Sequence, residues 1–485
     1  EIGKEYRTNR YQNFLNTEGF RDHSKLRQRI FNLKVRHKFS INTKLDWQFN
    51  YTNSPLAQDP GSLDIESINQ NRRFSRQRNK DYNAGEKINH LKTGFNLKTS
   101  LRNKMVFNNY IFYSHRDFYG KLPFKNGGII DLKRNYYGLG SSLDLEKENN
   151  KLRHKIKLGI EYLSQEDQRD RHENLIGDKG VITFSQLESF KNFGTYVLSN
   201  FEYKNLFVQT GLRYDNQNIG TDSIGNEIKY NSINPSLGIS YLIGKKSRVF
   251  INFSTSFESP SLSELSSNPS GKEGLNKNLN PSKAKNHEIG WKFFGTKTIV
   301  ETTLFYIKSS NELLPYELEE FPGRSFYRNS GSSARTGIEI SYKRTWKNFT
   351  LIRSLSYAKY VFDNYIKKGN DLRGNDIPGI PSKMSNVELN YNNKKGWQFQ
   401  FNYNNVGKFY AEDENKIKID SYTIYNIQSS KTFYNSWGEI LISGGIKNIF
   451  NNDYYDNIRI NAFGGRYYEA APGRNFFTSL TIKLL

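Results

Sequence analysis

Arginine and aromatic side chains are concentrated in three short segments of the sequence. A guanidinium group presents its N–H donors as a planar fork that matches carboxylates and other oxygen-rich anions, and aromatic rings supply flat apolar walls. Together these residue types favour binding of an anionic, oxygen-rich ligand. In chain order the candidates are Arg72, Arg73, Phe74, Arg76, Arg78, Phe321, Arg324, Phe326, Tyr327, Arg328, Tyr454, Tyr455, Arg459, Arg466, Tyr467 and Tyr468.

The same residues have two other interpretations. Basic side chains in exposed loops can simply be solvated and face the phosphates of an anionic lipid surface, and for any single arginine we favour this interpretation over direct ligand contact. Tyrosine and phenylalanine near strand ends are more often anchors at a membrane interface than walls of a binding site. The three segments are therefore candidates, and the sequence does not choose among their members.

Catalytic and metal-binding patterns are weak in this sequence. It contains no cysteine, which excludes disulfides and thiolate metal sites. Its seven histidines are scattered without metal-ligand spacing, and no Ser-His-acid grouping can be recognised. The pair Gly127-Gly128 lacks the strand-to-helix context of a phosphate-binding loop. We expect no catalytic residues, no metal site and no cofactor.

The net charge of +23 raises the question of nucleic-acid binding. The basic residues are spread over the whole chain and interleaved with Asp and Glu, and there is no recognition helix, zinc spacing or aromatic-basic consensus. We therefore expect no nucleic-acid partner. An anionic small ligand or an anionic lipid surface accounts for the sign of the charge.

Apolar and polar residues alternate along many segments. In 31–39 the residues Phe31, Leu33 and Val35 alternate with polar neighbours, and at the C-terminus Leu480 and Ile482 do the same. This period of two is typical of a β-strand with one apolar face. The apolar face of 31–39 carries no charge, as lipid requires, because a basic side chain at the membrane midplane costs about 2–4 kcal/mol. No run approaches the roughly 18 apolar residues of a transmembrane helix.

The connections between these segments alternate between short and long, as in outer-membrane barrels. The sequence thus predicts an all-β fold, a large antiparallel transmembrane β-barrel of about 20 visible strands with short periplasmic turns and long extracellular loops. A β-propeller or sandwich would not keep this rhythm. Short connections are expected near 40–43, 101–104, 147–151, 203–205, 244–247, 295–297, 344–347, 393–395 and 433–436, and long ones near 54–87, 115–133, 165–190, 215–231, 258–285, 309–335, 360–382, 408–420 and 448–473.

Arg213 lies between Leu212 and Tyr214 in one of the alternating segments. If these two neighbours face lipid, Arg213 faces the lumen, because successive side chains of a strand point to opposite faces. A charge at that position calls for an opposite charge, so we expect Arg213 to pair with a carboxylate.

Several motifs occur together in a fixed order. The C-terminal region contains GIKNIFNNDY at 445–454, GRYY at 465–468 and APGRNF at 471–476. Earlier come GLRYD at 211–215, NPSLG at 234–238, SFESP at 256–260, NLNP at 278–281 and EIG at 288–290. As a set they resemble the TonB-dependent outer-membrane receptors, and the resemblance covers essentially the whole chain.

The resemblance implies a 22-stranded barrel filled by an N-terminal plug, which imports a scarce large nutrient with energy supplied through TonB. We expect residues 1–485 to be the barrel domain, with the plug and about one hairpin outside this sequence. The partners implied are a ferric-siderophore or ferric-citrate type of ligand, TonB, through the N-terminal region that the sequence lacks, and outer-membrane lipid with lipopolysaccharide.

Other functions stay open at this stage. A barrel of this size could be a passive porin-like channel, a receptor for cobalamin, haem or an oligosaccharide, or a soluble all-β binding protein. The haem interpretation has weak support, because the haem receptors that this chain resembles carry a histidine between the motifs at 257–260 and 278–281. Here the nearest histidine is His287. A ferric siderophore is the ligand we expect.

Overall fold

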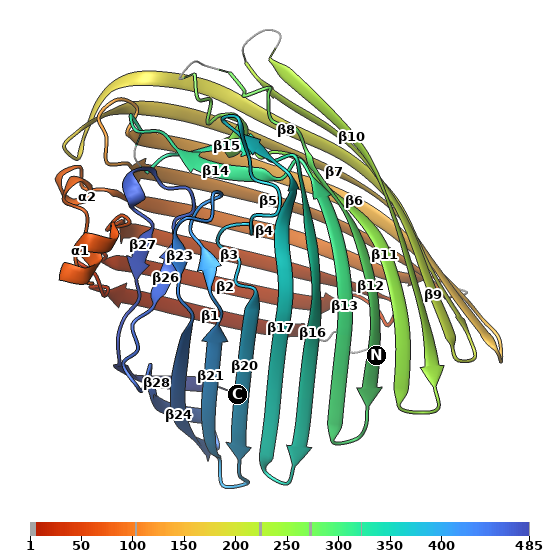
Figure 1. Ribbon diagram of the computed structural model, residues 1–485. Helices are drawn as coiled ribbons and strands as arrows, with labels where there is room; N and C mark the ends of the chain where they lie inside the picture. The colour runs from red at the N-terminus through yellow and green to blue at the C-terminus, as the bar shows by residue number, and fades with distance from the viewer. Residues whose placement is uncertain (1–5, 102–103, 223–225, 271–273, 322, 485) are drawn as a thin grey trace.

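The computed structural model describes residues 6–101, 104–222, 226–270, 274–321 and 323–484. Its main element is one 20-stranded antiparallel sheet (Figure 1). The strands of this sheet are β1 (Tyr6–Thr17), β2 (Leu26–Lys38), β3 (Thr43–Gln58), β4 (Gly85–Leu101), β5 (Met105–Lys121), β6 (Ile129–Glu148), β7 (Leu152–Leu175), β8 (Asp178–Tyr203), β9 (Leu206–Thr221), β10 (Glu227–Ile243), β11 (Ser247–Glu258), β12 (Ser282–Phe294), β13 (Thr298–Ser310), β16 (Ser332–Trp346), β17 (Phe349–Asn364), β20 (Lys383–Asn392), β21 (Trp397–Val406), β24 (Tyr422–Asn435), β25 (Gly438–Lys447) and β28 (Asn475–Leu484).

Each strand of the sheet pairs with the next one along the chain, so the topology is a simple meander. Within the described residues, β1 pairs only with β2, and β28 pairs only with β25. The sheet curls round so that its first strands lie behind its last strands in Figure 1. The prediction of a large antiparallel barrel wall of about 20 strands is confirmed.

The short connections lie together at one end of the sheet, at the bottom and right of Figure 1, and the longer ones lie at the other end. The turn between β8 and β9 needs only residues 204–205, and the turn between β16 and β17 only 347–348. Lys204 and Lys347 adopt positive φ angles there, as tight hairpins require. The short turns that fall on described residues are confirmed, and the turn predicted at 101–104 includes two residues outside the described ranges.

The long loop predicted at 165–190 is wrong. Strands β7 and β8 continue through that segment to a tip at residues 176–177. The loops predicted at 115–133 and 215–231 are also mostly strand, because β5 and β6 extend to 121 and from 129, and β9 extends to 221. Above the lipid both faces of a strand can be polar, so the apolar-polar contrast that identified the membrane segments disappears while the pairing continues. Parts of the loops predicted at 215–231, 258–285 and 309–335 lie outside the described residues.

The two faces of the wall differ in chemistry. Large apolar side chains such as Ile111, Leu139 and Ile160 are more than half exposed on the outer face. Polar side chains occupy the inner face, where Glu161, next to Ile160, accepts a hydrogen bond from the hydroxyl of Tyr110. A sheet with exposed apolar residues outside and polar residues inside matches a lipid-facing barrel wall.

The remaining elements are short and belong to the longer connections. They are α1 (Ile65–Gln70), α2 (Gln77–Asp81), α3 (Leu262–Leu265), the 3₁₀ turn η1 (Phe463–Gly465), and the small hairpins β14 (Leu313–Glu317) with β15 (Ser325–Asn329), β18 (Ile366–Lys367) with β19 (Asn370–Asp371), β22 (Phe409–Tyr410) with β23 (Lys418–Ile419), and β26 (Tyr455–Ile458) with β27 (Tyr468–Ala470). No helix in the described part of the chain has the length and apolar character needed to cross a membrane.

Buried apolar clusters occur among these connections. One gathers Leu63, Ile68 and Tyr468, and another gathers Leu262, Leu265 and other leucines against Ile219. The inner face of the wall is polar, so it offers no apolar core of its own. The long-loop end therefore holds small cores that fix the loops in place.

The outer face of the last strand allows a direct test of the assigned register. Leu480 and Ile482 are 63% and 55% exposed on the outer face of β28. Leu480→Arg should strongly reduce the amount of heat-modifiable, folded receptor in outer membranes, because arginine at the lipid midplane costs about 2–4 kcal/mol. Thr481→Arg, one residue away on the inner face, is the control and should assemble normally. Normal assembly of Leu480→Arg together with loss of Thr481→Arg would show that the register is shifted by one residue.

Candidate ligand-binding site

The hairpin β14–β15 is the central feature of the long-loop end. It belongs to the connection 311–331 between β13 and β16, which we call the crossbar, and in Figure 1 it runs across the upper end of the sheet. On one side the ring of Phe321 packs edge-on against Phe124, with 5.6 Å between ring centroids. From the other side, Arg459 donates to the carbonyl of Gly323 at 2.8 Å, and Asn461 donates to that of Pro315 at 3.3 Å. The crossbar thus joins the β5–β6 connection to the β25–β28 connection.

Glu317 of the crossbar is the centre of an ion-pair cluster. Its carboxylate lies 2.5 Å from Nε of Arg459 and 3.1 Å from a terminal nitrogen of Arg466, and the Glu317 side chain is only 3% exposed. Arg466 also donates from Nε to the carbonyl of Phe463 at 3.0 Å. One carboxylate therefore holds two guanidinium groups from a loop that is distant in sequence.

Two more arginines lie near this cluster without a carboxylate of their own. Among the described residues, neither Arg76 nor Arg78 has a carboxylate oxygen within 4 Å. Burial, together with the positive charges of Arg466 and Arg78, lowers the pKa of Arg76 to about 10, although Glu317 raises it. Burial likewise lowers the pKa of Arg466. We call the long-loop end of the wall the mouth, and Arg76, Arg78, Arg459 and Arg466 the mouth arginines. Their charge exceeds that of Glu317, so the cluster is suited to bind an anion.

Arg328 is held in a different buried cluster. It donates to Asp413 at 3.0 Å and to the hydroxyl of Tyr365 at 2.8 Å. Asp413 is fully buried and also lies 3.4 Å from Lys367 and 2.9 Å from the amide nitrogen of Asn461. Burial, and then the charge of Asp413, raises the pKa of Tyr365 to about 12, so this phenol stays a proton donor. Arg328 therefore ties loops together.

In the first arginine-rich segment, Arg72 is paired with a carboxylate and, among the described residues, Arg73 is not. Arg72 donates to the carbonyl of Tyr454, lies 3.2 Å from Asp453 and stacks over the ring of Tyr455 at 5.3 Å. Arg73 is exposed and lies over the ring of Phe20 at 5.6 Å. The contacts of Arg72 thus bind it to the β25–β28 connection, and Arg73 lies at the edge of the mouth.

The candidate tyrosines mostly pack against other loop residues. Tyr454 packs on Tyr422, with ring centroids 5.2 Å apart, and both Tyr455 and Tyr467 pack around the buried Tyr468. Tyr327 packs against the cluster that contains Leu262 and Leu265, and burial raises its pKa. These rings support the shape of the mouth.

Arg324 reaches from the crossbar towards the inner face of β7. Its guanidinium lies over the rings of Phe326 and Phe321, at 4.7 and 5.5 Å, and its Nε has no hydrogen-bond partner among the described residues. Burial, together with the positive charge of Arg169, lowers the pKa of Arg324 to about 10. Among the described residues, Arg324 is therefore a further partly buried cation that has no carboxylate oxygen within 4 Å.

The interpretation of the sequence missed the polar inner face of β7 and β8. Arg169 binds the buried Glu188 at 2.7 and 3.1 Å, and Arg134 binds the buried Asp167 at 2.8 and 2.6 Å. Asp167, Arg169 and Glu188 occur in the segment 165–190, which the sequence predicts to be a loop. The signal was present, because Gln165, Asp167, Arg169 and Arg171 recur at every second position, as the inner face of a strand requires.

Arg213 lies on β9, on the face opposite the exposed Leu212 and Tyr214. It forms two hydrogen bonds of 2.7 Å with the carboxylate of Asp215 and a further ion pair with Glu161 of β7. Both partners are carboxylates on the same face, so the charge of Arg213 is matched within the wall.

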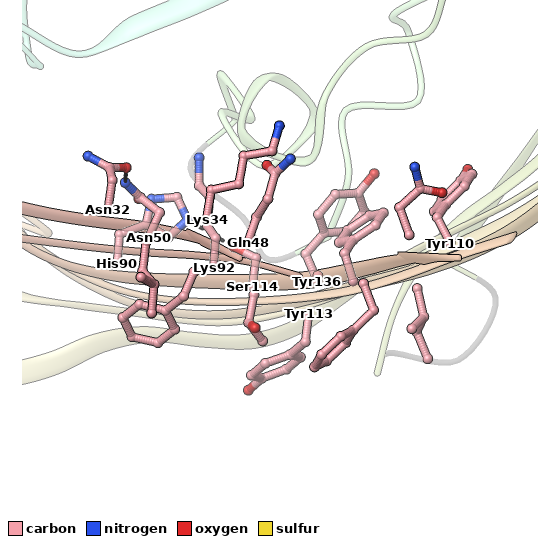
Figure 2. Close-up of a pocket in the computed structure, with 18 of the residues that line it drawn as sticks. Asn32, Lys34, Gln48, Asn50, His90, Lys92, Tyr110, Tyr113, Ser114 and Tyr136 are labelled. Carbon is pink, nitrogen blue, oxygen red and sulfur yellow. Dashed lines mark hydrogen bonds between the residues drawn. The ribbon is translucent and has the colours of Figure 1, made fainter. Parts of the chain in front are cut away.

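The inner face of β2–β6 is lined by polar side chains of several kinds. Figure 2 shows Asn32, Lys34, Gln48 and Asn50 on one side of the wall and Tyr113 on the other. The amide of Asn50 donates to Asn32 at 2.5 Å on this face. A polar lining suits the passage of a hydrated or polar ligand. The described residues include no group of three or more His, Cys, Asp or Glu side chains that could hold a metal ion.

Comparison with known proteins places this wall and its loops in a family. A family model described as "TonB dependent receptor-like, beta-barrel" matches residues 6–449. The chain belongs to the TonB-dependent receptors. The resemblance drawn from the sequence motifs is thereby confirmed, as are the location in the bacterial outer membrane and a role as a transporter that is not an enzyme. Coupling to TonB and a transported ligand follow from the family.

Solved structures share the fold at low sequence identity. The ferric citrate transporter FecA in its unliganded form superposes with a TM-score of 0.80 at 17% identity, covering 98% of this chain and 75% of its own. The siderophore receptor PiuA from Acinetobacter baumannii gives 0.76 at 14% identity, covering 99% and 77%. The copper transporter OprC gives 0.74 at 14% identity, covering 98% and 74%. At these identities the likeness shows the fold alone.

Glu317 provides a test of how the crossbar is held. Glu317→Gln should lower the free energy of unfolding of the mouth by roughly 3 kcal/mol, because it leaves Arg459 and Arg466 partly buried without a counter-charge. Limited proteolysis of the receptor should then cut within residues 311–331 and 448–474 much faster than in the wild type. Glu319→Gln, on the same connection but exposed, is the control and should leave the cutting rate unchanged. Equal rates in all three proteins would show that the ion pairs do not hold the crossbar.

Proposed function

We propose that this receptor imports an anionic ferric chelate of the siderophore or ferric-citrate type, with energy supplied through TonB. The observation that carries the proposal is the excess of mouth arginines over carboxylates, with Glu317 as the carboxylate that pairs with Arg459 and Arg466. Guanidinium groups bind carboxylate and catecholate oxygens in a fork, and partial burial strengthens such bonds. An anion bound here would also offset the positive charges of Arg466 and Arg78, which add to burial in lowering the pKa of Arg76.

Two proteins with the same fold support this ligand class: FecA is a ferric citrate transporter, and PiuA is a siderophore receptor. OprC, a copper transporter, has the same fold, so the fold does not decide the ligand. The charge of the mouth is what favours an anionic chelate over neutral ligands such as an oligosaccharide.

A passive porin-like channel is the alternative function. It predicts conductance through the complete receptor in a planar bilayer and uptake that does not need TonB. Under the importer proposal, the complete receptor is electrically silent and uptake stops in a strain without TonB. The two functions therefore differ in both measurements.

The Arg76→Gln variant tests the ligand class. With ferric citrate and a negatively charged ferric catecholate as probes, we expect the dissociation constant of the probe that the wild type binds to rise about tenfold, as the loss of one charge-assisted hydrogen bond implies. Arg373→Gln, an exposed loop arginine 3.8 Å from Asp371, is the matched control and should bind like the wild type.

Neutral chelates and cobalamin serve as further probes for the same proteins. Binding of a neutral ligand by the wild type, with no effect of Arg76→Gln, would contradict the proposal of an anionic ligand. Energy-dependent uptake of that neutral ligand would still leave the TonB-coupled importer intact.

A further inference from the structure

Five exposed lysines lie on the outer face of neighbouring strands at the long-loop end. The strands are β12, β13, β17 and β20, which stand side by side with β16 at the front of Figure 1. We call these residues the lysine belt; they are Lys283, Lys285, Lys308, Lys359 and Lys383.

The register fixes the face on which the belt lies. Lys285 is two positions from His287 and four from Ile289, which is 56% exposed to the lipid side, so all three share one face. On β17, Lys359 follows Tyr357, which is 61% exposed and lies opposite Lys383 of β20. The belt therefore forms the upper border of the apolar outer band, towards the long loops.

The charges of the belt are poorly balanced by the protein itself. Lys308 lies 3.2 Å from Asp363, and within the described part of the chain the other four lysines have no carboxylate oxygen within 4 Å. Lys285 is paired directly opposite Lys308 in the β12–β13 register. Like charges directly opposite each other on antiparallel strands destabilise the pair. An anionic partner outside the protein would turn this repulsion into a favourable interaction.

The position of the belt identifies the chemistry of that partner. A surface just above the apolar band of an outer-membrane barrel meets the headgroups of the outer leaflet, and its flanking tyrosines, Tyr306 and Tyr357, suit the interface between headgroup and hydrocarbon. Ammonium groups are compact point charges that bind phosphate well. Lysines spaced along four strands match several phosphates on one lipid or on adjacent lipids.

We propose that the lysine belt is a binding site for the phosphate groups of lipopolysaccharide in the outer leaflet. The site is separate from the mouth, because it lies on the outer face of the wall and faces lipid, whereas the mouth arginines lie among the loops. It would orient β12–β20 against the leaflet and hold the belt at headgroup level. This proposal does not depend on which ligand the receptor imports.

The test compares three forms of the receptor purified from outer membranes. The belt variant K285Q/K308Q/K359Q removes three charges, and the control K245Q/K297Q/K394Q removes three exposed lysines from the short turns. Each protein is titrated in detergent with diphosphorylated lipid A. A lysine near an anionic surface contributes a factor of about five, so the belt variant should bind on the order of 100-fold more weakly. The control should bind like the wild type.

Additional variants and ligands test whether the loss of lipid A binding is caused by the loss of contacts to its phosphates. The charge-preserving variant K285R/K308R/K359R should restore binding, dephosphorylated lipid A should bind weakly to every form, and wild-type affinity should fall as salt rises. Heat-modifiable gel mobility verifies that each variant is folded. Equal binding by the belt variant and the wild type would overturn the proposal. So would equal losses in the belt and control variants, a wild-type affinity that is independent of salt, or inorganic phosphate that binds as tightly as the lipid.

Discussion

Hydrogen bonding of the backbone is the constraint on which the rest of this structure depends. In hydrocarbon, an N–H or C=O group without a partner costs several kcal/mol, so a wall made of strands must pair residue for residue. The described sheet does so from β2 to β25, each strand being paired on both edges. Once pairing is fixed, alternate side chains must face lipid, and every connection must lie beyond the apolar band. The period of two and the segregation of charge follow from this single requirement.

Beyond the lipid the constraint is relaxed, and other forces take over. Both faces of β7 are polar over residues 165–174, yet the strand continues, because pairing is still favourable in water. The lumen offers no apolar core, so the connections stabilise themselves with small clusters such as that of Leu63 and Ile68 and with buried ion pairs around Glu317 and Asp413. Order at the mouth is therefore a property of loop-to-loop contacts.

The sequence was informative where the lipid constraint acts, and less so elsewhere. The strands of the membrane band could be located because charge is excluded from one face, and the short turns could be located because they separate consecutive alternating segments. The ends of β5, β7 and β9 could not be located, since a polar strand in water has the composition of a loop. The ordered motifs indicated the family, and the alternation of apolar and polar residues with the rhythm of the connections indicated the fold class.

The sequence predicted which segments of the mouth are rich in arginine, but not which carboxylate each arginine pairs with. The three arginine-rich segments do meet at one end of the wall, as expected for connections on the same side. Which arginines are left over depends on partners far away in sequence: Glu317 and Arg466 are 149 residues apart, and Arg328 and Asp413 are 85 apart. A count of arginines cannot distinguish Arg328, which is matched by a buried carboxylate, from Arg76, which is not. Only the unmatched charge has free energy to gain from a bound anion, so the balance of charge, rather than its amount, determines what the mouth can bind.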